Sequence, residues 1–148
     1  MSLLVQGLAR LLLAPILMVA FAVLVKGYAD VGDGFAAGAI ASLAILLQYI
    51  AFGREQTERT LAIRLLPAAA FVGLLSALAI TAAPLASGDP LLTHRPGAGT
   101  EPIHLGTLEL IGAFAFDIAV FLLVLGATLG IIHAIAREAE RVEGIEPR

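Results

Sequence analysis

The stretch from Leu108 to Gly126 reads LELIGAFAFDIAVFLLVLG, and its only charged residues are the carboxylates Glu109 and Asp117. A membrane-spanning helix needs about 20 mostly apolar residues. This stretch and its flanks therefore predict a span over residues 105–136. Asp117 then lies about 10 Å inside the span, at about 1.5 Å per residue. An ionised side chain at such a depth is costly and commonly marks an ion or proton pathway.

Three further segments are long and apolar enough to cross a membrane: residues 8–28, 34–52 and 63–86. The chain is 59% hydrophobic and 14% charged, whereas soluble domains are about 45–50% apolar and about 25% charged. We therefore predict an all-α integral membrane fold with four transmembrane helices, in which residues 1–148 form a single domain. A cleaved signal peptide is the alternative for the first span, but its small-residue triplet Ala20–Ala22 lies inside the apolar run.

The distribution of basic residues predicts the orientation of the chain. Four spans place both termini and the second loop on one side of the membrane. Lys and Arg are enriched in cytoplasmic loops, so we expect both termini in the cytoplasm. The predicted inner side holds Arg10, Arg54, Arg59, Arg64, Arg137, Arg141 and Arg148, and the outer side holds Lys26 and Arg95.

The sequence also argues against several classes of function. It contains no cysteine, which excludes disulfides, thiol catalysis and zinc–thiolate sites. It has no basic stripe of the kind that binds nucleic acid. Phosphate-binding glycine loops, nucleophile elbows and His-Glu-x-x-His zinc pairs are also missing from it. We therefore expect neither an enzyme nor a bound metal or cofactor.

Asp117 is the strongest candidate for chemistry, either as an ion station or as a hydrogen-bonding group that locks a helix contact. Glu109 lies eight residues earlier. On one continuous helix, the two carboxylates are about 80° apart in azimuth and about 12 Å apart in height, so they cannot touch. They are candidates for separate stations along one groove, although simple solvation also explains Glu109. Lys26 closes the first span on the same side, where it either reaches the interface or pairs with one of these carboxylates.

The histidines are secondary candidates. His94 and His104 lie in the third loop, and histidine titrates near neutral pH, so either residue is able to pass protons. Exposure to solvent is the simpler explanation for both, although His94 is retained as an ion-path candidate near the outer mouth. His133 lies about 160° around the fourth helix from Asp117, so one straight groove does not easily serve both. Gln48, inside the second span, is expected to satisfy a hydrogen bond between helices.

Two pairs of glycines have the spacing that allows close helix packing in lipid. Gly34 and Gly38 form one pair in the second span, and Gly126 and Gly130 form another in the fourth. Small residues let helix backbones approach closely where water supplies no driving force. The partner is either another helix of this chain or another subunit. The alternative is that these glycines only reflect the high frequency of glycine in membrane helices.

Three segments together resemble the MnhB family, the B-type small subunits of the Mrp-type multisubunit sodium/proton antiporters. KGYADVGDGFAAGAIASLAILLQYIAFG, from Lys26 to Gly53, resembles that family's SGHNAPGGGFxxGL segment and the span that follows it. GDPLLTHRPG, from Gly88 to Gly97, resembles its GxPFLTH loop. TLELIGAFAFDIAVFLLVLGATLGII, from Thr107 to Ile132, resembles its TELxxAxxFDxGVYLVVVGxxxxII segment. The Phe116–Asp117 pair and the run Leu92–His94 are the most specific points of similarity.

The resemblance implies a small subunit of a multisubunit antiporter in a prokaryotic plasma membrane. It implies other antiporter subunits as partners, the lipid bilayer as surroundings, and sodium ions and protons as the transported species. Such a subunit either lines part of an ion path or holds larger subunits together. A related hydrogenase-like or respiratory membrane complex is the alternative assembly. The sequence departs from the family at Val31–Phe35, where Pro-Gly-Gly-Gly-Phe is usual, and it lacks a lysine just before the Thr-Glu-Leu pattern.

Overall fold

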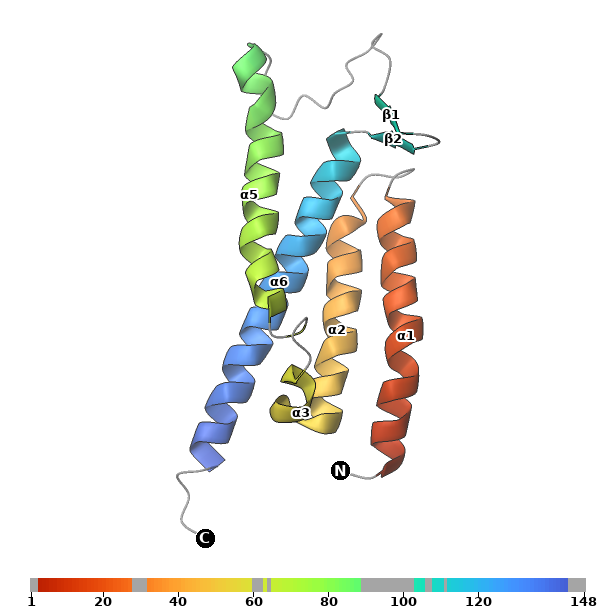
Figure 1. Ribbon diagram of the computed structural model, residues 1–148, viewed down its shortest axis with the longest axis vertical. Helices are drawn as coiled ribbons and strands as arrows, with labels where there is room; N and C mark the ends of the chain where they lie inside the picture. The colour runs from red at the N-terminus through yellow and green to blue at the C-terminus, as the bar shows by residue number, and fades with distance from the viewer. Residues whose placement is uncertain are drawn as a thin grey trace.

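The computed structural model describes residues 3–27, 32–59, 63, 65–88, 103–105, 108–110 and 112–143. Helices dominate this part of the chain (Figure 1). The helices are α1 (Leu3–Lys26), α2 (Gly34–Phe52), the short α3 (Arg54–Glu58), α5 (Ala69–Ala82) and α6 (Gly112–Glu143). Two 3-10 turns, η1 (Leu66–Ala68) and η2 (Ala83–Ser87), flank α5, and two short strands, β1 (Ile103–Leu105) and β2 (Leu108–Leu110), precede α6.

The prediction of four spans is confirmed. Four helical stretches are long and apolar enough to cross a membrane: Leu3–Lys26, Gly34–Phe52, Leu66–Ala86 and Gly112–Val142. The second has the predicted bounds, because Gly and charged residues flank its apolar run on both sides. α6 has 32 residues, or about 48 Å of helix, so it exceeds the roughly 30 Å of a hydrocarbon core.

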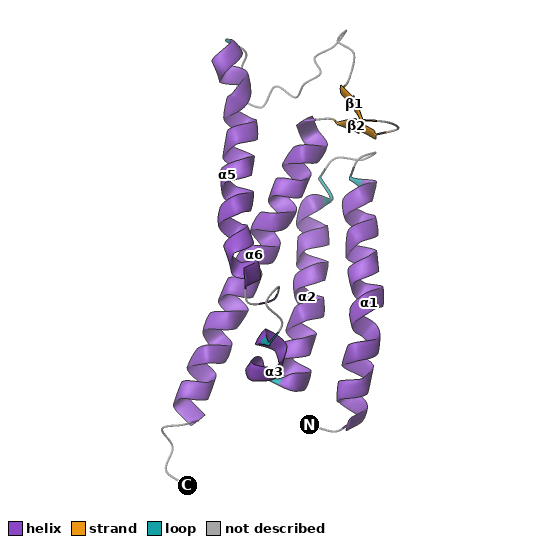
Figure 2. Cartoon of the chain, viewed as in Figure 1, coloured by secondary structure: helices purple, strands orange, loops and turns teal. Residues whose placement is uncertain are grey.

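The predicted start of the fourth helix, at residue 105, is wrong. β1 and β2 pair as an antiparallel ladder with His104 opposite Glu109, and α6 begins only at Gly112 (Figure 2). The segment IHLGTLEL alternates apolar and polar residues on each side of Gly106–Thr107, and alternation with a period of two is typical of strands. Leu108 and Leu110 are apolar like the helix that follows them, so the sequence pattern assigned this segment to that helix. Glu109 therefore belongs to a hairpin, and the helical azimuth that we predicted between it and Asp117 does not apply.

The four long helices stand in a row, in the order α1, α2, α6 and α5 (Figure 1). α2 lies between α1 and α6, which explains why it has the most buried residues among the helices. Its buried positions are mostly glycine, alanine and serine, and these allow close backbone approach in lipid. The outer helices α1 and α5 expose most of their large apolar side chains, as expected for surfaces that face lipid or other subunits.

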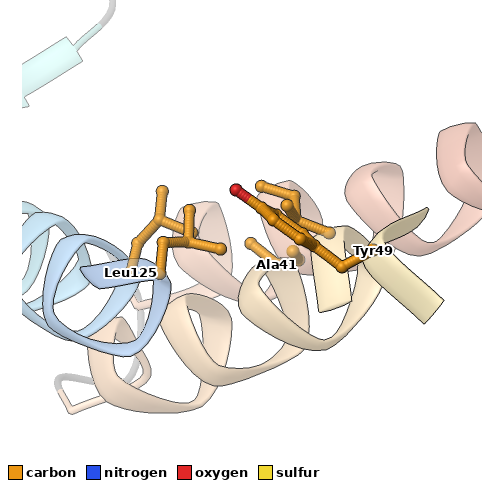
Figure 3. Close-up of a cluster of buried hydrophobic side chains, with 6 residues drawn as sticks. Ala41, Tyr49 and Leu125 are labelled. Carbon is orange, nitrogen blue, oxygen red and sulfur yellow. The ribbon is translucent and has the colours of Figure 1, made fainter. Parts of the chain in front are cut away.

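A small apolar cluster joins α1, α2 and α6 near the middle of the bundle. It contains Ala20, Ala41, Ile45, Tyr49, Leu125 and Leu129, and Figure 3 shows Ala41 and Tyr49 of α2 facing Leu125 of α6. A buried polar contact lies nearby, where the Gln48 side-chain amide donates a 2.8 Å hydrogen bond to the Ala9 carbonyl of α1. The predicted role of Gln48 in joining two helices is confirmed.

Both the start of α1 and the end of α6 lie at the end of the bundle that carries α3 (Figure 1). The excess of arginine at this end leads us to expect it in the cytoplasm. An epitope tag on either terminus should therefore be digested by protease in inside-out vesicles and protected in right-side-out vesicles. Protection in the inside-out vesicles would reverse this orientation.

Candidate functional site

Asp117 lies in the second turn of α6, at the end of the bundle away from α3 (Figure 1). Its residue surface is only 3% exposed. One carboxylate oxygen, Oδ2, accepts a 2.9 Å hydrogen bond from the backbone N–H of Gly32, which lies in the connection between α1 and α2. A buried charge needs such partners because burial removes its hydration. The contact joins two segments that are 85 residues apart in sequence.

Glycines on both sides of this connection let its backbone close over Asp117. A Cβ atom on Gly27 would lie 2.9 Å from Asp117 Oδ2, and one on Gly34 would collide with the Asp117 carbonyl group. Gly32 has a φ of +117°, which is the region of backbone conformation that favours glycine. Side chains at Gly27 and Gly34 would thus prevent the close approach of these segments to Asp117.

An ion pair between Lys26 and Asp33 flanks the same connection. Lys26 Nζ lies 3.1 Å from Asp33 Oδ2, and the Lys26 side chain is 63% exposed. Asp33 directly precedes α2, and its carbonyl accepts the first backbone hydrogen bond of that helix from Ala37. The sequence singled out Lys26 but missed this carboxylate, although Asp33 lies only seven residues further along.

The structure brings together some of the predicted site residues. Lys26 and Asp117 lie at the same end of the bundle, on either side of the connection between α1 and α2. Glu109 is in β2, next to the start of α6, and the predicted pairing of Lys26 with Glu109 lies outside the side chains that the structure describes. His94 also lies outside the described residues.

The predicted packing glycines lie against helices of this same chain. Gly38 faces the Phe121 carbonyl and Val124 of α6, at 3.0 Å from an added Cβ, and Gly126 faces the backbone of Ala70 in α5. A Cβ on Gly130 would only reach ordinary contact with Pro67, at 3.8 Å. Gly73 of α5 was not predicted, although it packs on the backbone of α6 at Leu123. It was missed because it has no second glycine four residues away.

His133 lies at the α3 end, far from Asp117, as its position along α6 predicts. Its Nδ1 atom is 2.7 Å from Glu58 Oε1 in α3. Sequence reasoning missed Glu58 because the run GREQTERT is typical of a solvated loop. The available signal was the spacing of Arg54 and Glu58, which places opposite charges four residues apart on one helix.

Comparisons with known proteins show which family the chain resembles. A family model described as a domain related to the MnhB subunit of Na+/H+ antiporter matches residues 4–130. The chain is 34% identical to the B subunit of the Na(+)/H(+) antiporter of Bacillus subtilis over 93% of this chain and 94% of that protein. It is 33% identical to the protein of the same name from Alkalihalophilus pseudofirmus, over 91% and 92% of the two chains.

A third relative is the A/B subunit of a probable K(+)/H(+) antiporter of Rhizobium meliloti. The identity is 36% over 84% of this chain, but the match covers only 12% of that much longer protein. The family model covers α1, α2, α5 and the part of α6 that holds Asp117. By the extent of these matches, the chain belongs to the family of domains related to the MnhB subunit of Na+/H+ antiporters.

Proposed function

We propose that this chain is a multi-pass plasma-membrane component of a multisubunit antiporter that exchanges a monovalent cation for protons. Membership of the family and the antiporter names of three relatives support this function. They favour an antiporter over a hydrogenase-like or respiratory complex. The family is one of transporter components, so the proposed role is transport and not catalysis. Na+ is the cation named for two relatives and K+ for the third.

Within that assembly, we assign Asp117 to an ion path. The supporting observation is a carboxylate only 3% exposed, on a spanning helix, with its Oδ2 accepting a hydrogen bond from the backbone N–H of Gly32. The hydrogen bond offsets part of the cost of burying the negative charge. A carboxylate in such a site is able to take up either a proton or a small cation, and that exchange is the elementary step of antiport.

The exposed Lys26–Asp33 pair supports access to Asp117 from the end of the bundle where both lie. Asp33 and Gly32 are adjacent, so an ion pair with an exposed lysine is next to the backbone group that holds Asp117. In the proposed orientation, this end faces the outer side of the membrane, where antiport of sodium or potassium would release the cation and admit the proton.

The proposed function predicts that exchange depends on this chain. Inside-out vesicles that hold the complete antiporter and have been acidified internally by respiration should release protons when Na+ or K+ is added. Vesicles that lack only this chain should lose that response, because an assembly without its Asp117 station is incomplete. A pH-sensitive dye measures the response, and re-expression of the wild-type chain is the control. Full exchange without the chain would refute the proposal.

A purely structural role is the second candidate function. The close contacts of Gly34 and Gly38 with α6, and of Gly126 with α5, show how densely this chain packs. These contacts are internal, so a scaffold for larger subunits would use the exposed faces of α1 and α5. A substitution on an exposed face of α1 or α5 that prevents assembly without unfolding this chain would favour the scaffold, whereas an assembled but inactive Asp117→Asn complex would favour the ion path.

A further inference from the structure

A cavity of about 280 Å³ lies between α1, α2 and α3, at the end of the bundle that carries α3 (Figure 1). We call it the Arg10 cavity, and nothing in the proposed role of Asp117 uses it. The residues that line it come from these three helices and from the segment after α3: Arg10, Leu13, Gln48, Phe52, Gln56, Thr57 and Ile63. Its wall thus combines one cationic group, three neutral polar side chains and three apolar ones.

The charge of the Arg10 cavity distinguishes it from another cavity at the same end of the bundle. Arg10 is the only charged side chain among the described residues that line it. The other cavity, of about 590 Å³ between α3 and α6, is lined by His133 together with three arginines and three glutamates, whose charges balance one another. The Arg10 cavity is therefore the one that attracts an anion.

The guanidinium of Arg10 is held in place but keeps its charge. Its Cζ atom lies 4.8 Å from the centre of the Phe52 ring, a cation–π contact that positions the group without neutralising it. No carboxylate among the described residues lies within ion-pair distance of Arg10. Arginine stays protonated in proteins, and its fork of N–H donors matches the oxygens of a phosphate group. Arg10 therefore offers both charge and hydrogen bonds to a phosphate.

Two of the neutral polar side chains fix the wall, and the third is exposed. Gln48 and Thr57 are each only 6% exposed. The Gln48 amide donates a 2.8 Å hydrogen bond to the Ala9 carbonyl, and the Thr57 hydroxyl donates one of 2.8 Å to the Gly53 carbonyl. The wall is thus formed without a ligand. Gln56 is exposed, and its amide N–H groups are able to donate to a ligand oxygen in the cavity.

The level of Arg10 along the bundle matches that of lipid headgroups. α2 has 19 residues, or about 29 Å of helix, which is close to the roughly 30 Å of a hydrocarbon core. Phe52 is the last residue of α2, so in a membrane that α2 spans, Phe52 lies at the edge of that core. The ring contact places the Arg10 guanidinium at the same edge, where the phosphate groups of the lipids begin.

Apolar surface continues from the cavity along α1. Leu13 lines the cavity, and Leu17, one helical turn further toward the middle of the bundle, is 38% exposed on the same side of α1. Phe52 and Ile63 add apolar groups to the cavity wall. A ligand with an anionic head and a hydrocarbon tail therefore fits this surface better than a free anion, which would leave the apolar part uncovered.

We propose that the Arg10 cavity binds the headgroup of an anionic phospholipid. Arg10 binds the phosphate, Gln56 donates to a neighbouring headgroup oxygen, and an acyl chain lies along Leu13 and Leu17. A zwitterionic lipid carries a cationic group that has no described carboxylate to pair with in this cavity, so the anionic lipid is preferred. In the orientation expected above, the cavity opens to the inner leaflet, whose surface is negative.

Lipid binding is tested with the full-length chain in nanodiscs that contain equal amounts of phosphatidylglycerol and phosphatidylcholine. Native mass spectrometry counts the lipids that stay bound when the chain is released from the nanodisc. We expect the wild type to retain one phosphatidylglycerol several-fold more often than one phosphatidylcholine. Arg10→Gln should lower the retention of phosphatidylglycerol by about tenfold, because a hydrogen bond to a charged group is lost.

Arg59→Gln is the matched control. It removes an arginine from the same end of the bundle, with a 75% exposed side chain that does not line the cavity, so it should leave retention unchanged. Gln56→Glu is a second variant, which keeps Arg10 and its ring contact. It places a negative charge beside the lipid phosphate at an exposed position, so the chain should fold and retention should fall. Circular dichroism verifies that each variant is folded.

Equal retention of the two lipids by the wild type would overturn the preference for an anionic lipid. Equal losses in Arg10→Gln and Arg59→Gln would overturn the Arg10 cavity as the binding site. Inorganic phosphate at millimolar concentration should not displace the retained lipid, and displacement would mean that the cavity takes a free anion instead. None of these measurements requires a working antiporter, so a failure here is separable from a failure of the proposed function.

Discussion

Asp117→Asn is expected to lower cation/proton exchange by at least about tenfold while the protein remains in its complex, which is about 1.4 kcal/mol on the activation barrier. Asparagine has nearly the shape of aspartate, and its side-chain oxygen still accepts the hydrogen bond from Gly32 N–H. What it lacks is the ability to release a proton or to hold a cation by charge. Exchange that requires the carboxylate to change its occupancy is therefore lost, although the packing of the site is kept.

The measurement is proton release from inside-out vesicles after addition of Na+ or K+, scaled to the amount of assembled complex on native gels. Glu138→Gln is the matched control, because it removes a carboxylate from the same helix at a 66% exposed side chain. It should leave exchange unchanged. Wild-type exchange in an intact Asp117→Asn complex would eliminate the ion path and leave the structural role. Removing a buried charge should not weaken the fold, so low assembly is not expected.

The position of Asp117 on a long apolar helix was predictable from the sequence, but its surroundings were not. Helix periodicity and the apolar run around it are local properties, and they place one carboxylate on a helix that is long enough to span a membrane. The partner, Gly32 N–H, is 85 residues away in sequence, and its direction depends on a backbone conformation with φ of +117°. Neither feature leaves a local signal, so sequence alone identified the charged group but not the backbone that holds it.

The same contrast applies to the fold. The bounds of α2 were predictable because Asp33 and Gly53 interrupt an otherwise apolar run. The start of α6 was not, because the apolar residues of β2 continue directly toward the helix. Glu58 was overlooked because its burial arises only when α6 crosses α3 and places His133 beside it. Contacts between distant segments, and not local composition, decide which charges are solvated.

Gly34→Ala is expected to destabilise the protein by about 2–3 kcal/mol and to reduce the amount of assembled complex, because overpacking of a close contact costs energy. The added Cβ would meet the backbone of Asp117, including its Cα at 3.0 Å. Backbone atoms cannot rotate away as a side chain can, so α2 must separate from α6. Unfolding of the purified protein in a series of detergent mixtures measures the loss, and native gels measure assembly.

Gly130→Ala is the control for this prediction, because an added Cβ at that position should not destabilise the protein. Its Cβ would lie 3.8 Å from Pro67, at ordinary contact distance, and alanine favours helix over glycine by about 1 kcal/mol. The variant should therefore be neutral or slightly more stable. Equal losses in Gly34→Ala and Gly130→Ala would show that the glycines matter for some reason other than backbone approach.

Gly126→Ala separates the packing of the bundle from the ion site. Its Cβ would collide with the backbone of Ala70 in α5, so it should destabilise the protein about as much as Gly34→Ala. It acts on the opposite side of α6 from the connection that holds Asp117, so each complex that still assembles should exchange ions normally. In Gly34→Ala, the shift of α2 also moves the neighbouring Gly32 N–H away from Asp117, and exchange per assembled complex should fall as well. If exchange per assembled complex were equally affected in Gly34→Ala and Gly126→Ala, the geometry around Asp117 would not matter for exchange.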